Sequence, residues 1–182
     1  AIIMKKSAQF VLKTKYVLKS ILFCIIFTGL FVLFSFIKFS IPGKFERLSH
    51  GIIGTFAAFL TTALFLRFDN KSFADIGLKI EKTTLKKFFT GVLVGACIMG
   101  LLAMGTIYFS EFKIVANENS GILNFLFLTL PLIPLAFMEE VGFRAYPLTF
   151  LNGKIGFRNS IIITSILFAF YHIANGWTIQ NS

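Results

Sequence analysis

The chain has 182 residues, of which 56% are hydrophobic and 14% charged, and its mean hydropathy is +0.81. Soluble domains carry about 25% charged residues, so this composition excludes an ordinary soluble protein. Several apolar runs of about 17–22 residues are long enough to cross a bilayer as helices, which predicts an all-α fold, a polytopic transmembrane bundle of about five helices. The net charge of +10 indicates no nucleic-acid partner, because the basic residues cluster between the apolar runs.

The first three predicted helices follow a basic start. Residues 1–19 contain five lysines and are predicted to be a cytoplasmic N-terminal segment, either a solvated tail or an amphipathic helix on the membrane surface. Residues 20–182 are predicted to form the bundle. Its first helices span about Ser20 to Ile37, Gly51 to Leu66 and Phe88 to Phe109. Glycine, alanine and threonine in the second favour close packing between helices.

Proline and glycine mark the breaks in the rest of the bundle. The fourth helix is predicted over residues 121–146, and two prolines in its middle, Pro131 and Pro134, predict a kink. Residues 147–160 are predicted to be a polar re-entry segment that turns at Asn152-Gly153 and leads into a fifth helix.

The distribution of basic residues predicts the orientation in the membrane. Lysine and arginine number five, three, six, one and three in the successive segments outside the apolar runs. Segments rich in basic residues stay in the cytoplasm, so the N-terminus and the connection between the fourth and fifth helices are predicted to be cytoplasmic. The chain is therefore expected to be a multi-pass integral membrane protein, with the lipid bilayer as a partner.

Two adjacent acids, Glu139 and Glu140, lie inside the apolar run from Ile122 to Phe143. All other acidic residues lie in or beside polar stretches. A carboxylate at membrane depth is costly and marks a functional site by default. Both acids are expected about 6–10 Å inside the cytoplasmic end of the fourth helix, at about 1.5 Å per residue.

Helical spacing gives the two acids different predicted roles. Glu140 and Arg144 are four residues apart and share a face, so we expect a buried arginine that braces Glu140 through paired hydrogen bonds. Glu139 points about 100° away and has no charge partner on its own helix. A general base needs an accessible lone pair, so Glu139 is the predicted reactive carboxylate.

His172 is the second polar feature, in an apolar stretch of the fifth helix. A lone histidine in such a helix is more often a packed residue than a catalytic one, but Glu139 on the adjacent antiparallel helix favours a shared site. His172 is expected one turn or more deeper in the membrane than Glu139. The pair could activate water directly or ligate a divalent metal such as zinc. A catalytic zinc takes about three protein ligands and the pair supplies two, so direct activation is favoured and no cofactor is assigned.

The motif Glu-Glu-x-x-x-Arg at 139–144, followed by Phe-x-x-x-His at 168–172, resembles the CPBP intramembrane protease family. That family includes the type II CAAX prenyl endopeptidases and bacterial proteins of bacteriocin processing and self-immunity. The stretch Ala74–Leu78, expected to be a short structured turn ahead of a glycine-rich helix, is also similar. The resemblance covers Phe73 to His172 and implies a protease core at 73–182, endopeptidase activity at or within the membrane, and a bacterial plasma membrane.

The resemblance also implies a role for each matched residue. Glu139 would activate the hydrolytic water, Glu140 and Arg144 would complete the first motif, and His172 would hold the water or a metal. The implied substrate is a membrane-associated peptide or lipidated protein, such as one with a prenylated CAAX tail. The sequence sets no oligomeric state.

One departure from the family pattern concerns a later motif. Family members carry a further histidine, with an asparagine or aspartate four residues after it, in a later helix. Here no histidine follows His172, and Asn175 comes only three residues after it. We therefore expect a C-terminally truncated or incomplete homologue that would be inactive alone. Two other functions stay open, a non-enzymatic binding protein such as a bacteriocin immunity factor, and a proton relay or transporter, although no internal repeat supports the latter.

Overall fold

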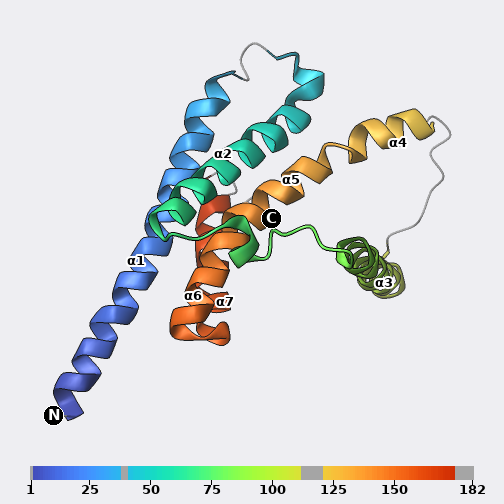
Figure 1. Cartoon of the computed structure of the whole chain (residues 1–182). Coiled ribbons are helices and arrows are strands. Elements are labelled where there is room, and N and C mark those ends of the chain that lie inside the picture. Colours follow the sequence, from blue (N-terminus) through green and yellow to red (C-terminus); the bar gives the residue numbers. More distant parts are fainter. Residues whose placement is uncertain (1, 38–40, 112–120, 175–182) are drawn as a thin grey trace. The chain divides into compact units, whose positions relative to one another are not determined.

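The computed structural model describes residues 2–37, 41–111 and 121–174 (Figure 1). All regular elements in these ranges are helical, so the predicted all-α fold is confirmed. They are α1 (Ile2–Ser35), η2 (Gly43–Phe45), α2 (Glu46–Phe68), η3 (Phe73–Ile76), α3 (Thr84–Phe109), α4 (Ile122–Thr129), α5 (Leu132–Glu139), η4 (Glu140–Leu148), α6 (Thr149–Ile155) and α7 (Phe157–Ala174). The chain divides into two units, residues 1–78 with 126–182 and residues 79–125, and each is described by itself.

Helix length and apolarity support a membrane protein. In the part of the chain that the structure describes, four stretches are long and apolar enough to cross a bilayer: Val11–Ser35, Gly43–Phe68, Thr84–Phe109 and Ile122–Ile155. A shorter apolar helix covers Phe157–Ile173. The chain is thus a multi-pass integral membrane protein, while the direction in which it crosses the bilayer stays a prediction.

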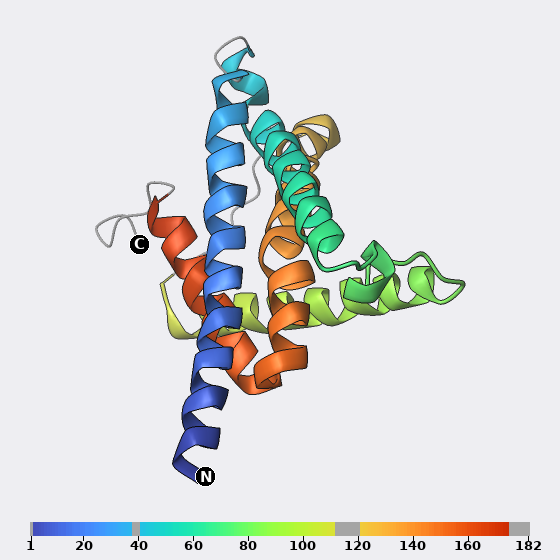
Figure 2. The same ribbon diagram turned by 60° about the vertical axis from the view of Figure 1, so that its left-hand side comes forward.

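In the larger unit, α1 and α2 pack side by side, and α5 packs against α2 (Figures 1 and 2). Gly51 permits the close approach of α2 to α5, because a Cβ atom there would lie 2.7 Å from the backbone nitrogen of Leu135. The Thr55 hydroxyl, one turn further on, donates a hydrogen bond of 2.6 Å to the carbonyl oxygen of Pro134. The predicted close packing of the second helix is confirmed, and it positions α5, which ends at Glu139.

Aromatic side chains fill the space between α1, η4 and α7. Phe27 of α1 meets Phe143 edge-on, with ring centroids 5.7 Å apart, and stacks on Tyr171 at 5.7 Å. Phe23 stacks on Tyr146 at 5.0 Å. All five rings are buried, and each pair of this kind contributes about 0.5–1.5 kcal/mol beyond its buried area. One aromatic layer therefore holds both η4 and α7 against α1.

The fourth predicted helix breaks where the sequence indicates but ends later. α4 stops at Thr129 and α5 begins at Leu132, with Pro131 at the junction, so the expected kink is confirmed. The cause is the proline ring, which removes an N–H donor and crowds the preceding turn. The predicted re-entry segment at 147–160 is wrong, because η4 and α6 continue the helix to Ile155.

The turn between α6 and α7 lies at Gly156 rather than at Asn152-Gly153, which stays helical. Gly156 has φ +82° and ψ 161°, a conformation that side chains disfavour and glycine adopts readily. The asparagine–glycine pair correctly indicated that the helix ends in this region, but the helix ends three residues later.

Other boundaries shift for one shared reason. α1 continues without interruption from Ile2, and α2 starts at Glu46, earlier than predicted in both cases. The predicted starts followed apolarity, which marks the part of a helix that lies in lipid and not the helix ends. The predicted structured turn at Ala74–Leu78 is confirmed, since η3 is closed by a capping box of Ser72 and Asp75 and followed by Gly77 at φ +83°.

Candidate active site

The acidic pair lies where the helix changes its geometry. Glu139 is the last residue of α5, and Glu140 opens η4, a π-helix that contains Pro147. In an α-helix the Pro147 ring would clash with the carbonyl of residue 143. A π-helix, which bonds residue i to i+5, is wider and is found frequently at functional sites. The helix is therefore wider from Glu140 onward.

Glu139 and His172 face each other from α5 and α7. The Oε1 atom of Glu139 lies 3.9 Å from Nε2 of His172, and the two side chains are 33% and 27% exposed. The structure thus brings together the two residues that the sequence paired. Both side chains are largely covered by neighbours and still reachable.

The expected offset in depth between these residues does not occur. Glu139 precedes the end of α6, Ile155, by 16 residues, and His172 follows the start of α7, Phe157, by 15. Because the two helices are antiparallel and the numbers of residues between each side chain and the turn at Gly156 are nearly equal, Glu139 and His172 lie at the same distance from that turn. The expected 6–10 Å between the acids and the helix end is also wrong, because α6 extends the helix, and Glu139 lies about 24 Å from that end at about 1.5 Å per residue.

A backbone contact sets the tautomer of His172. Its Nδ1 lies 2.9 Å from the carbonyl oxygen of Phe168, one turn earlier on α7. A carbonyl oxygen can only accept, so Nδ1 carries the proton and donates it. In the neutral ring Nε2 then presents its lone pair toward Glu139. At 3.9 Å, a water molecule that donates to both atoms lies beside the line that joins them.

Glu140 and Arg144 form the predicted ion pair within one helical face. Arg144 Nη1 donates to Glu140 Oε1, four residues earlier. The expectation of a buried arginine is wrong, since the Arg144 side chain is 63% exposed and that of Glu140 is 53% exposed. Both side chains are thus exposed, whereas Phe143 and Tyr146 of the same helix are buried in the aromatic core.

A small pocket adjoins the acidic residues, with a volume of about 50 Å³, enough for more than one water molecule. Seven residues from η4, the end of α5 and α7 line it: Glu139, Glu140, Phe143, Arg144, Thr164, Ser165 and Phe168. Sequence reasoning missed Thr164 and Ser165. Their signal was spacing, because Ser165, Phe168 and His172 recur at intervals of three and four residues and share one face of α7.

A second polar cluster that the sequence did not reveal lies at Asp69, directly after α2. Its carboxylate accepts hydrogen bonds from Lys19 of α1 and from the Tyr146 hydroxyl of η4, the latter at 2.6 Å. Partial burial raises the Asp69 pKa, but the hydrogen bonds from Lys19 and Tyr146 and the charges of Lys19 and Lys71 outweigh it, so that the pKa lies below its usual value. This cluster connects three helices, including the one that follows the acidic pair.

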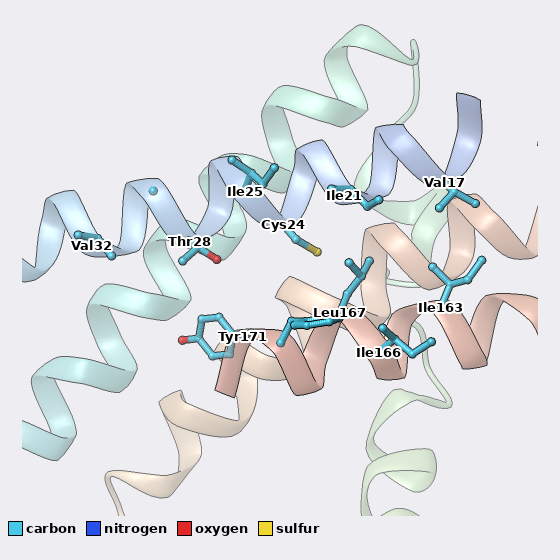
Figure 3. Close-up of a pocket in the computed structure, with 12 residues that line it drawn as sticks. Val17, Ile21, Cys24, Ile25, Thr28, Val32, Ile163, Ile166, Leu167 and Tyr171 are labelled. Atoms are coloured by element: carbon cyan, nitrogen blue, oxygen red, sulfur yellow. The ribbon is translucent and has the colours of Figure 1, made fainter. Parts of the chain in front are cut away.

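An apolar groove of about 820 Å³ lies between α1 and α7 (Figure 3). Aliphatic side chains line it from both helices, among them Val17, Ile21, Ile163, Ile166 and Leu167. Tyr171, which neighbours His172 in sequence, closes part of the groove. None of the acidic residues lines the groove, and its lining is almost entirely apolar.

Glu139 and His172 are the candidate ligands for a catalytic metal at this site. Glu139 and His172 supply a carboxylate oxygen and an imidazole nitrogen, two of the three protein ligands that a catalytic zinc usually takes. Among the described residues, no three histidine, cysteine, aspartate or glutamate side chains come together. The described donor set therefore does not complete a zinc site.

Comparison with known proteins gives one family match. The family described as type II CAAX prenyl endopeptidase, Rce1-like, matches residues 120–181, which span α4 to α7. The chain matches no curated protein and no solved structure. The matched stretch contains both motifs, with Glu139, Glu140, Arg144 and His172, so the recognition drawn from them is confirmed. Over residues 120–181, about a third of its length, the chain is thus similar to the type II CAAX prenyl endopeptidases, Rce1-like.

Proposed function

We propose that this chain acts as an intramembrane endopeptidase in which Glu139 and His172 activate the hydrolytic water. The family match implies a protease and therefore a peptide or protein substrate. The observation that supports the assignment of residues is the 3.9 Å separation of Glu139 Oε1 and His172 Nε2, from two different helices.

The chemistry follows from the two acceptors. A water molecule between them donates one hydrogen to Glu139 and the other to His172 Nε2, and this leaves its oxygen lone pairs for attack on a carbonyl carbon. Glu139 takes a proton as the carbon–oxygen bond forms. The carbon–nitrogen bond of the tetrahedral intermediate then breaks, and the proton held by Glu139 passes to the leaving amine. The Nδ1 contact with Phe168 keeps the imidazole in the tautomer that this step needs.

Glu140 and Arg144 hold the start of η4 in place beside this water. Because Arg144 pairs with Glu140, Glu139 has no cationic partner on its own helix. A divalent metal such as zinc would require a third ligand beside Glu139 and His172, and no step here depends on one.

The substrate that suits this proposal is a membrane-associated protein with a lipidated C-terminal tail, by analogy with the family's prenylated CAAX substrates. We place the chain in the plasma membrane of a bacterium with the basic helix ends toward the cytoplasm. A lipidated tail would then reach Glu139 within the bilayer, about 24 Å from the helix end at about 1.5 Å per residue. A bacteriocin immunity protein that binds without cleaving is the non-enzymatic alternative, and the absence of cleavage would favour it.

The test is cleavage of a quenched fluorescent peptide that ends in farnesyl-cysteine and three further residues, with the full-length natural protein in liposomes. Glu139→Gln should lower kcat about 1000-fold or more, since a general base alone contributes about 10²–10⁴-fold. Glu139→Asp, which keeps the carboxylate but shortens it, should retain more activity. Full activity of Glu139→Gln would refute the proposed role of this residue.

A further inference from the structure

Ser165 is the one polar residue of the small pocket that the hydrolytic scheme leaves without a role and whose hydroxyl makes no hydrogen bond within the described residues. The Thr164 hydroxyl, also in the pocket, donates to the carbonyl oxygen of Ser160 at 2.9 Å. That of Ser160 donates to the carbonyl oxygen of Gly156 at 2.7 Å. The hydroxyls of Ser160 and Thr164 thus donate to backbone carbonyls one turn earlier, whereas the Ser165 hydroxyl is available to hydrogen-bond a substrate.

The position of Ser165 relative to the catalytic pair follows from the antiparallel pairing of the two helices. Glu139 lies opposite His172, and Phe143 lies opposite Phe168, with ring centroids 5.1 Å apart. Arg144 and Ser165 come next and line the same pocket. Ser165 therefore lies about 10 Å from His172 along α7, at about 1.5 Å per residue.

An extended peptide advances about 3.3 Å per residue, so this interval corresponds to about three residues of substrate. Between the two ends, the Phe143 and Phe168 rings form an apolar wall. A peptide that lies along this strip has its reactive carbonyl beside Glu139 and a main-chain group beside Ser165.

A main-chain group of a bound peptide needs a hydrogen-bond partner here because the site lies among apolar helices. Water is scarce among apolar helices, and each backbone N–H or C=O of a bound peptide that loses water without gaining a partner costs free energy. A serine hydroxyl can donate to a carbonyl or accept from an N–H. Arg144 is the other donor at this end of the pocket, and its Nη1 is already paired with Glu140.

We propose that Ser165 is a substrate-binding residue whose hydroxyl pairs with the peptide main chain about three residues from the bond that is cleaved. The proposal rests on the proposed protease function, because it takes the Glu139–His172 pair as the place of cleavage. It assigns to Ser165 a role in affinity and in the register of the peptide and none in the chemical step.

Binding measured separately from cleavage tests the proposal. The probe is the farnesyl-cysteine peptide with a fluorophore, bound to the full chain in liposomes in the Glu139→Gln background, so that no peptide is consumed. Ser165→Ala should raise Kd about threefold to tenfold, the range expected from one lost hydrogen bond. Ser165→Thr, which keeps the hydroxyl, should restore affinity. Ser160→Ala, the matched control, should leave Kd unchanged, because this buried hydroxyl lies outside the pocket.

A modified peptide makes the test specific for the main chain. Replacing the amide three residues from the scissile bond with an ester removes its N–H and weakens the adjoining carbonyl. The ester should weaken binding to the chain with Ser165 by the same factor as Ser165→Ala, and should have no further effect on the Ser165→Ala variant. Equal Kd values for Ser165 and Ser165→Ala, additive effects of ester and variant, or no binding of the peptide by either would overturn the proposal. A loss of cleavage in the chain with Glu139, with peptide binding intact, would instead count against the protease function.

Discussion

At the scale of single residues, the polar side chains inside apolar helices were readable from the sequence. Glu139 and His172 stand out because burying an ionisable side chain at membrane depth costs free energy and is typical of functional sites. The structure brings Oε1 of Glu139 and Nε2 of His172 within 3.9 Å of each other. Ser165 and Tyr146 were not readable in this way. Serine and tyrosine are common in membrane helices and cost little free energy there. Their partners can be identified only once the register between two neighbouring helices is known.

The exposure of the Glu140–Arg144 pair sets a limit on its contribution to stability. Ion pairs with both partners accessible are worth about 0–1 kcal/mol. Glu140→Gln and Arg144→Gln should therefore change the unfolding free energy by less than about 1 kcal/mol, while they lower kcat because the start of η4 is held less well. Thermal unfolding in detergent, beside peptide cleavage, measures both. A loss of stability of several kcal/mol would contradict the exposed position of the pair.

At the scale of helices, apolarity predicted which segments span the membrane but not where helices end. The α5–η4–α6 run shows why, since Pro147 and Asn152-Gly153 are both accommodated within it. The π-helical geometry of η4 absorbs the proline, and glycine inside a helix costs only about 1 kcal/mol. Local signals for a break are therefore outweighed where neighbouring helices hold the segment, as α1 and α2 hold η4.

The contact between α2 and α5 gives a prediction for Gly51. A Cβ atom at Gly51 would meet backbone atoms of Pro134 and Leu135 at 3.1 and 2.7 Å, which cannot yield by side-chain rotation. Gly51→Ala should thus destabilise the protein by about 1–3 kcal/mol and lower activity by displacing α5. Gly29→Ala is the control, because no atom lies within 4 Å of a Cβ there. An unchanged melting temperature for Gly51→Ala would contradict the close packing of these helices.

The Asp69 cluster gives a prediction for pH. The folded-state pKa of Asp69 is lowered, so its contribution to stability is present above the unfolded value of about 3.9 and is lost as pH falls through the folded value. The melting temperature of the full chain in detergent should fall more steeply below about pH 4 than that of Asp69→Asn. Tyr146→Phe, which removes one donor to this carboxylate, should reduce the difference. Parallel curves for all three chains would argue against a folded-state role of this carboxylate.

At the scale of the whole molecule, two lysines of the larger unit lie over aromatic rings where α1 and α6 pack together. The Lys154 ammonium of α6 lies 5.2 Å from the ring centroid of Tyr16, and Lys19 lies 4.9 Å from that of Phe150. The end of α6 thus lies beside the middle of α1, around Tyr16 and Lys19. This contact is compatible with the prediction that both segments are cytoplasmic. The all-α fold class was predictable from the long apolar runs, whereas four of the about five predicted helices are long and apolar enough to span, and the fifth is shorter.

Labelling of introduced cysteines tests the orientation. In a chain without native cysteines, Lys15→Cys and Lys154→Cys should react with an impermeant maleimide only from the cytoplasmic side. Lys44→Cys, which lies between α1 and α2, should react only from the opposite side. Labelling of Lys44→Cys and Lys154→Cys from one side would overturn the predicted topology.

The joint action of Glu139 and His172 on one water is the central claim, and a double-mutant cycle tests it most directly. The measurement is kcat for the farnesyl-cysteine peptide with the full chain in liposomes, for Glu139→Gln, His172→Ala and the double variant. Residues that act as a unit are strongly non-additive, so the double variant should be about as slow as the slower single variant. Effects that multiply, with both variants folded, would show that the two residues act independently and would contradict the shared water.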